Sequence, residues 1–427
     1  MQEQLQLPSA QGRLTHLDWL RIIVVGMLIP FHTAMTFAPY AWYIRNPQLN
    51  LATQALVQVL DKYHMELLFF IAGVATFFSL GTRDWKGYLP ERLKRLVVPL
   101  VFGMLVVVPP CYYYSQLFFN PFFRTTYSGL WDWYTKYWLA KAITPFNIYF
   151  GGKVNAGALW FLWYLVLYTF VLFPFLYIIF RKAQDRFIPR LAAFFEKPAA
   201  LLLAVIPIMA VNVFSQWKWT IGIHSYRIIG WTITSDFQVL YYALFFILGF
   251  FIYSNARFGK GIDKTGPFAL PIAAITMTLF MLLVFPTWNK APLNQFWYKL
   301  HGEPGTTGFV LSQCLYALTT WSWILSILYL ARKFLNKNNR FVQYGNEAVL
   351  PFYIVHSTFI AVFSYFVVKW KMDVLPKYVI IVALSYLGSL AILELMKLAN
   401  PTRFLFGMRM KKRPASKEIG GAVNAGK

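Results

Sequence analysis

Long apolar stretches, each close to the thickness of a bilayer, recur along the whole chain and are separated by polar segments. About 20 predominantly apolar residues let an α-helix cross the hydrocarbon core, and near-continuous apolar runs favour helices over alternating barrel strands. The pattern predicts an all-α polytopic membrane protein, a bundle of about ten transmembrane helices. We place the helices at residues 17–37, 57–80, 96–114, 159–180, 198–215, 235–254, 268–286, 309–331, 349–369 and 375–396.

Composition supports this class and excludes others. The 427 residues are 58% hydrophobic and only 13% charged, which excludes a soluble globular protein and a disordered chain. The two cysteines, Cys111 and Cys314, fall in or beside separate spans, so we expect neither a disulfide framework nor a bound metal. The net charge of +24 lies mainly in short loops, where membrane topology explains it, and we expect no nucleic-acid partner.

The basic residues also predict the orientation of the chain. Most of the 40 Lys and Arg residues lie in the N-terminal segment, in every second loop and in the C-terminal segment. Because Lys and Arg are enriched on the cytoplasmic side, both termini are predicted to be cytoplasmic. We expect the first span to be a retained signal anchor. Residues 1–400 are predicted to form a single integral-membrane domain, and residues 401–427 a basic, disordered cytoplasmic tail.

The first span carries an arginine and a histidine separated by ten residues, Arg21 and His32. Eleven steps along a helix return to within about 20° of the starting direction, so both side chains share one face roughly 16 Å apart. Pro30 removes a helical hydrogen bond and can open the backbone near Gly26. Ionisable groups inside a membrane are expensive and by default mark a functional site. We interpret His32 as a proton acceptor; the alternative is a buried histidine that only bonds between helices.

A second histidine, His64, lies near the outer end of the second span and is predicted at the depth of His32. Asp61, three residues earlier, could orient its ring. Glu66 follows Lys62 by four residues, the spacing of a helical ion pair. We therefore favour a structural Lys62–Glu66 pair over a catalytic glutamate.

Basic residues precede the third span in the segment ERLKRLVVP, which contains Arg92 and Arg95. Arginines at i and i+3 share a helix face and can grip phosphates in forked geometry. Plain positive-inside signalling is the alternative. Arg21 should lie at the same side of the membrane, so the three arginines could form one anion site.

Three further residues are candidates on position alone. Trp160, close to the outer boundary of the fourth span, could belong to an aromatic belt or stack on a sugar ring. His356 in the ninth span and Glu394 near the inner end of the last span are ionisable groups within the membrane, each equally compatible with a structural or a functional role.

Several segments together resemble the integral-membrane acyltransferase family 3. They occur in the order expected of that family, whose hallmark is an arginine and a histidine ten residues apart in the first span: LDWLRIIVVGMLIPFH, YHMELLFFIAG, ERLKRLVVPL, LWFLWYLVLY, FFILGFFIY and FYIVHSTF. Within the family, the chain looks most like the glucan biosynthesis protein C branch, associated with succinylation of periplasmic glucans in bacteria; its closing segment ELMKLANPTRFLF is similar too. Two features depart from the pattern: the single His356 followed by Ser357 and Thr358, and Glu66 where an uncharged residue is common.

The resemblance implies an acyl-CoA co-substrate on the cytoplasmic side, acetyl-CoA or succinyl-CoA, and no tightly bound cofactor. It implies a hydroxyl acceptor on an extracytoplasmic glycan or glycolipid, a bacterial inner membrane, and association with envelope polysaccharide machinery. In this reading His32 is catalytic with Arg21 and His64 beside it, and Arg92, Arg95 and Arg21 bind the donor. Two alternatives stay open: a transporter or flippase of a glycolipid that makes no bond, and a non-catalytic subunit of an envelope polymer machine.

Overall fold

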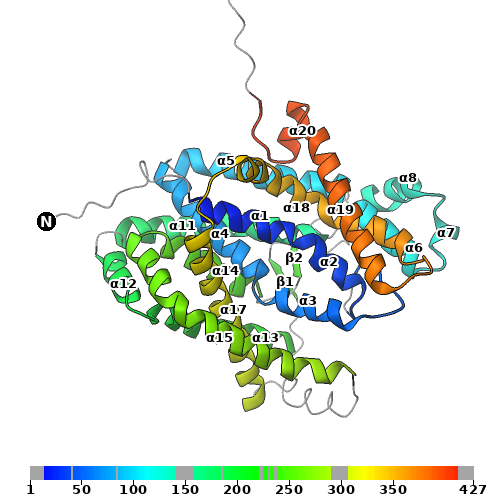
Figure 1. Cartoon of the computed structure of the whole chain (residues 1–427). Helices are drawn as coiled ribbons and strands as arrows, with labels where there is room; N and C mark the ends of the chain where they lie inside the picture. The colour runs from blue at the N-terminus through cyan, green and yellow to red at the C-terminus, as the bar shows by residue number, and fades with distance from the viewer. Residues whose placement is uncertain are drawn as a thin grey trace, which may run out of the picture.

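A computed structural model of the chain describes residues 14–39, 42–82, 85–140, 157–183, 186–220, 225–228, 231–234, 238–289 and 306–411. They form a bundle of helices (Figure 1). Within these ranges, nine helical segments are long and apolar enough to cross a membrane, and a shorter apolar helix, α14 (Gln238–Ile252), lies where the sequence predicts the sixth span, 235–254. The predicted all-α membrane bundle is confirmed.

Each spanning segment consists of one, two or three helices in succession. Their components are α1 (Thr15–Gly26) and α2 (Leu28–Thr36), α3 (Leu51–Asp61) and α4 (His64–Thr82), α5 (Trp85–Phe102), η1 (Gly103–Val107) and α6 (Pro109–Phe119), η3 (Gly157–Leu159) and α11 (Trp160–Ala183), η4 (Ala200–Ala204) and α13 (Val205–Thr220), α15 (Ala256–Asn289), α17 (Thr307–Phe334), α18 (Arg340–Val367) and α19 (Val374–Met396).

Shorter elements connect the spans. They are α7 (Phe123–Thr126), α8 (Leu130–Trp133), the π-helical turn η2 (Tyr134–Leu139), α12 (Phe187–Phe195) and α20 (Asn400–Leu405). A small antiparallel hairpin, β1 (Ser225–Ile228) with β2 (Trp231–Thr234), pairs Ser225 with Thr234 and Ile228 with Trp231. The sequence pattern did not predict this hairpin, because its strands are only four residues long.

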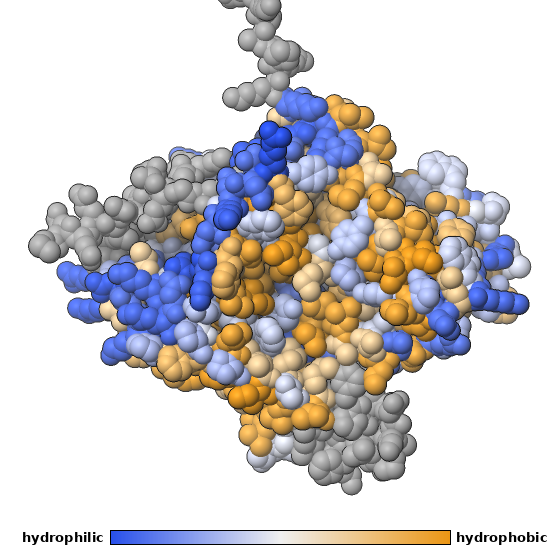
Figure 2. All heavy atoms as spheres, viewed as in Figure 1, coloured by the Kyte–Doolittle hydropathy of each residue, from blue (hydrophilic) through white to orange (hydrophobic). Residues whose placement is uncertain are grey.

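Apolar side chains on the outside of the bundle fit a lipid environment. Hydrophobic residues cover the middle of the face in Figure 2, while hydrophilic residues gather at its left end and around α20. Large side chains such as Phe175, Ile275 and Leu387 are about two-thirds exposed on spanning helices. Exposed apolar surface on this scale is rare in water and ordinary against acyl chains.

The first span is interrupted where the sequence predicts an opening. Pro30 has no N–H, and so the carbonyl of Gly26, four residues earlier, lacks a helical donor. The hydroxyl of Tyr386 donates to this carbonyl at 2.7 Å, and that of Tyr378 donates to the Pro30 carbonyl at 3.2 Å. Two tyrosines of α19 thus supply hydrogen-bond donors to backbone carbonyls at the break between α1 and α2 at Met27.

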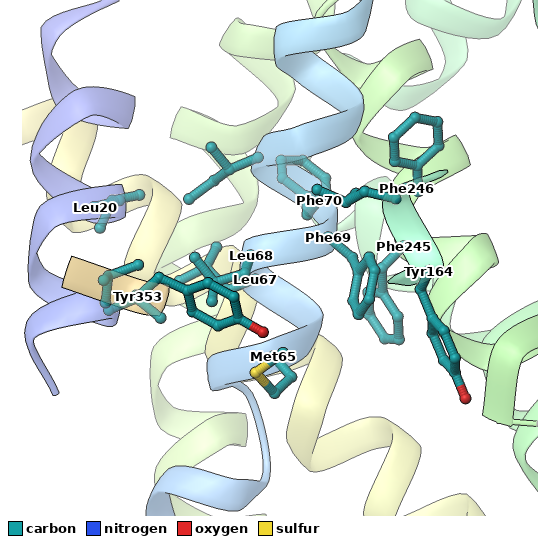
Figure 3. Packing of buried hydrophobic residues seen from close by; sticks show 14 of the residues in the cluster. Leu20, Met65, Leu67, Leu68, Phe69, Phe70, Tyr164, Phe245, Phe246 and Tyr353 are labelled. Atoms are coloured by element: carbon teal, nitrogen blue, oxygen red, sulfur yellow. The ribbon is translucent and has the colours of Figure 1, made fainter. Parts of the chain in front are cut away.

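Helix α4 lies at the centre of the bundle, between α1 and α18 on one side and α11 and α14 on the other (Figure 3). Leu68 points toward Tyr353 of α18, while the Phe69 ring stacks on that of Tyr242 of α14 with centroids 4.9 Å apart. Helices α4 and α14 cross with their backbones in close approach. A Cβ added to Gly73 would lie 1.9 Å from the carbonyl oxygen of Phe246, and one added to Gly249 would lie 2.0 Å from that of Phe70.

The C-terminal boundary needs a correction. A disordered tail from residue 401 is wrong for residues 401–411, because α20 packs against α5. The Phe406 ring meets that of Phe102 edge to face at 5.1 Å, and Arg403 is buried. The segment therefore belongs to the folded domain, and the rest of the predicted tail, 412–427, lies outside the described residues.

Alanine at either glycine of the α4–α14 crossing should destabilise the protein. The new Cβ would overlap a backbone carbonyl, so the helices must separate, at a cost of about 1–3 kcal/mol. We expect Gly73→Ala and Gly249→Ala each to lower the midpoint of thermal unfolding in detergent. Gly129→Ala is the matched control, since a Cβ there has no neighbour within 4 Å. An unchanged midpoint for both crossing variants would contradict this packing.

Candidate active site

A cavity of about 920 Å³ lies between α1, α4, α5, α11 and α18 and is completed by residues 403–409. One part of its wall is polar and carries arginines. The other part is apolar and includes Val25, Leu68, Phe161 and Leu165. A single space therefore offers both cationic and apolar surface, which suits a ligand with a charged end and a long neutral arm.

The arginines of the wall come from three separate parts of the chain: Arg21, Arg92, Arg95, Arg403 and Arg409. Arg21 and the α5 pair, which the sequence predicted could form one anion site, line the same cavity. Arg403 and Arg409 were missed, because they lie in the segment interpreted as a tail.

These arginines differ in how far other side chains of the protein already engage them. The Arg95 guanidinium lies 3.8 Å from the Glu91 carboxylate, and Arg403 forms an ion pair with Glu347. The Arg92 guanidinium lies over the Tyr88 ring, 5.8 Å from its centroid, and its buried Nε has no hydrogen-bond partner among the described residues. Arg92 therefore retains hydrogen-bonding capacity for a ligand.

Tyr353 connects the cavity to a cluster of histidines. Its side chain lines the cavity, and its carbonyl accepts a hydrogen bond from Nδ1 of His356 at 2.5 Å. The His356 ring stacks near that of His32, with centroids 5.3 Å apart. Phe31 lies between His32 and His64, at 4.9 and 4.4 Å from their rings. The structure thus brings the three predicted histidines together from three spans.

Hydrogen bonding assigns the proton positions of two of these rings. Nδ1 of His356 donates to the Tyr353 carbonyl, and Nδ1 of His64 donates to the Leu60 carbonyl at 2.7 Å. In a neutral imidazole the other nitrogen, Nε2, is then an acceptor. Nε2 of His356 is buried without a partner in the described structure. His32, half-buried, has its Nδ1 3.4 Å from the Met35 sulfur.

The closest ring partner of His32 is one that the sequence did not reveal. The Trp42 indole stacks on the His32 imidazole with centroids 4.4 Å apart and an interplanar angle of 6°. Its Nε1 is buried and unpaired among the described residues. Tyr43 meets Trp42 edge to face, and burial raises the pKa of Tyr43 well above its usual value, so this phenol stays neutral. Trp42 lies in a loop, where no helical period signals a contact.

Glu66 does not pair with Lys62, which corrects the favoured prediction. The Lys62 ammonium lies 3.3 Å from Asp61 and over the rings of Phe280 and Tyr316. Glu66 is buried, and its Oε2 has no hydrogen-bond partner among the described residues. Asp61 is engaged with Lys62, so the acceptor for the His64 ring is a backbone carbonyl.

None of the three histidines or Glu66 lines the cavity, and the two remaining candidates, Trp160 and Glu394, do not line it either. Trp160 packs among aromatic rings, including Phe69 at 6.0 Å, Tyr164 and Tyr242 at 5.3 Å each. Glu394 is exposed and accepts from Lys397 at 2.8 Å and from Tyr344 at 2.6 Å. Ring packing therefore accounts for Trp160, and an ion pair and a hydrogen bond account for Glu394.

The residues after His356 have structural partners. The Thr358 hydroxyl donates to the Val107 carbonyl at 2.6 Å and lies 3.3 Å from the Cys111 sulfur. These bonds hold α18 against η1 and α6. In the described ranges, no group of three or more His, Cys, Asp and Glu side chains is arranged to hold a metal ion.

A multi-span bundle with an arginine-lined cavity, and with histidines clustered nearby, defines an integral-membrane protein with a candidate functional site within its spans. A family model described as an acyltransferase domain matches residues 14–394. The chain belongs to this family, acyltransferase family 3, and it is a membrane acyltransferase. No curated protein and no solved structure matches it significantly.

The stacking of Trp42 on His32 should support the histidine when it carries a proton. An imidazolium over an indole face gains about 1–2 kcal/mol, equivalent to roughly 5–30-fold in rate. We expect Trp42→Leu to lower the rate of acyl transfer by this factor and Trp42→Phe, which keeps a ring, to lower it less. The measurement is the initial rate of purified variants with matched unfolding midpoints. Equal rates for Trp42→Leu and wild type would show that the stack does not assist transfer.

Proposed function

We propose that the protein is an acyl-CoA-dependent O-acyltransferase that moves an acetyl or succinyl group to a hydroxyl of an extracytoplasmic carbohydrate. The observation that carries this proposal is one cavity with an arginine-lined wall and an apolar wall, lined also by Tyr353, whose carbonyl accepts a hydrogen bond from His356, the ring stacked near His32. Membership of an acyltransferase family supports bond chemistry over transport of an unchanged glycolipid.

The donor would bind with its phosphates on Arg92, Arg95 and Arg21. Guanidinium groups recognise phosphate oxygens through paired, charge-assisted hydrogen bonds. The uncharged pantetheine arm would run along Val25 and Leu68 toward Tyr353, because this surface requires no desolvation of charge. The distribution of basic residues supports a cytoplasmic location for the arginine end, the compartment that supplies acyl-CoA.

His32 would act as the general base. It removes the proton of the acceptor hydroxyl as the oxygen attacks the thioester carbonyl, and the resulting imidazolium returns the proton to the departing CoA thiolate. The alternative course is a transient acyl-imidazole, which would give ping-pong kinetics. His356 and His64 lie close enough to influence the same proton, and Arg21 shares the donor end of the cavity.

The acceptor would approach from the opposite end of the bundle. The resemblance to the glucan biosynthesis protein C branch favours a periplasmic glucan, a bacterial inner membrane and work beside envelope polysaccharide machinery. Attack by a carbohydrate hydroxyl at His32 requires only that the sugar reach the outer part of the first span, about 16 Å along the helix from Arg21.

Replacing His32 should abolish transfer while leaving the fold intact. The assay offers labelled acetyl-CoA and succinyl-CoA with envelope glycans to protein held in nanodiscs, and measures acylated glycan. We expect product from wild type and at least a roughly 100-fold loss in His32→Ala, because general base catalysis contributes about 10²–10⁴ in rate. His16→Gln is the matched control: His16 lies on α1 and bonds Tyr253, away from the cavity. A folded His32→Ala variant with normal transfer would refute the assignment.

Replacing Arg92 should weaken donor binding. Loss of a charge-assisted contact costs about 1.5–3 kcal/mol, so we expect Arg92→Gln to raise the KM for the acyl-CoA roughly 10–100-fold. Arg257→Gln is the control, since Arg257 faces Glu196 and does not line the cavity. Equal effects of the two substitutions would indicate general electrostatic attraction rather than a site on α5.

A further inference from the structure

The cavity wall extends beyond the part of the chain that the family shares. The family match ends at residue 394, yet Arg403, Gly407, Met408 and Arg409 line the cavity. These residues belong to what we call the C-terminal strap, residues 400–411, which follows α19 and contains α20. The strap therefore lies beyond the matched residues and still forms part of the cavity wall.

Internal hydrogen bonds close the strap into a defined shape. The side chain of Asn400 donates to the Lys411 carbonyl at 3.2 Å and accepts from the Lys411 N–H at 2.7 Å. Nε of Arg403 donates to the Arg409 carbonyl at 2.7 Å, and the Met408 N–H donates to the Arg403 carbonyl at 2.8 Å. The backbone that carries Arg409 is thus fixed by the side chain of Arg403.

Glycine at position 407 lets the strap approach the cavity. Its φ of +68° lies in the left-handed region, which favours glycine. A Cβ there would also lie 2.7 Å from the Leu350 side chain and 3.1 Å from the Arg95 carbonyl. The strap consequently reaches α5 and α18, the two helices that carry most of the polar wall.

Some arginines of the strap and of α5 are paired with carboxylates, and others are not. Arg403 is paired with Glu347, as Arg95 is with Glu91. Neither Arg409 nor Arg92 forms an ion pair with any described residue. Two uncommitted cations face one cavity from different elements, an arrangement that an anionic ligand with two separated charged groups would stabilise.

We infer that Arg409 binds the 3′-phosphate at the nucleotide end of the donor, and that the strap makes the enzyme selective for thioesters that carry this group. The inference rests on the proposed function. Arg92 is half-buried and suits the pyrophosphate, which lies nearer the thioester. Arg409 is exposed at the rim and suits the ribose phosphate, which lies farther from it.

The test compares the acyl-CoA that the enzyme uses with its 3′-dephospho form, which carries the same thioester. We expect wild type to bind and use the 3′-phosphorylated form with a KM roughly tenfold lower. Arg409→Gln should raise the KM for the 3′-phosphorylated form to the level of the dephospho form. It should leave the KM for the dephospho form and both kcat values unchanged. Arg409→Lys, which keeps a positive charge, should show a smaller rise in KM. Lys411→Gln, in the strap but outside the cavity wall, should behave as wild type.

Two results would overturn the inference, and they are distinguishable from failure of the proposed function. Equal KM values for the two thioesters in wild type, or an equal rise for both in Arg409→Gln, would show that Arg409 does not bind the 3′-phosphate. Neither result would contradict CoA as the donor. Failure of wild type to bind either thioester in calorimetry would overturn both the donor and the contact. Gly407→Ala supplies an independent arm, because displacing the strap should produce the same selective loss.

Discussion

The backbone contact between α4 and α14 is the constraint on which the rest of the bundle depends. Gly73 and Gly249 each place a carbonyl of the opposite helix where a side chain would otherwise stand. In a membrane, where lipid is as apolar as the core, such close approach supplies the packing that holds helices together. Because α4 is fixed at the centre, its opposite face can present small residues, Ala72 and Ala75, to the cavity, and its beginning can hold His64 beside Phe31.

The cavity separates two tasks that conflict inside a bilayer. In the proposed function, phosphate binding requires strong cations, which are costly at the membrane centre, and the arginines that would supply them line the cavity wall together with Glu91 and Glu347. Proton transfer would fall to His32 and His356, whose rings lie 5.3 Å apart and do not line the cavity. Apolar side chains such as Val25 and Leu68 form the rest of the wall, where an uncharged part of the donor would bind.

Sequence reasoning succeeded where helical periodicity applies and failed where the backbone departs from a continuous helix. Apolar length predicted the spans, whereas the shared face predicted for Arg21 and His32 crosses the break at Met27, and of the two only Arg21 lines the cavity. The Lys62–Glu66 pair failed because α3 ends at Asp61 and α4 begins at His64, so the four-residue spacing crosses a turn. Trp42 and Arg409 come from a loop and from a strap that looked like a solvated tail, and only tertiary structure brings such segments to the site.

The break at Met27 gives the first span a property that its sequence spacing conceals. Arg21 belongs to α1 and His32 to α2, and the carbonyl at the joint is held by Tyr386 of α19 rather than by the next turn of its own helix. The two ends of the site are therefore not the ends of one rigid rod. The separation between Arg21 and His32 is therefore not fixed by one continuous helix, and it depends on how α19 holds the joint between α1 and α2.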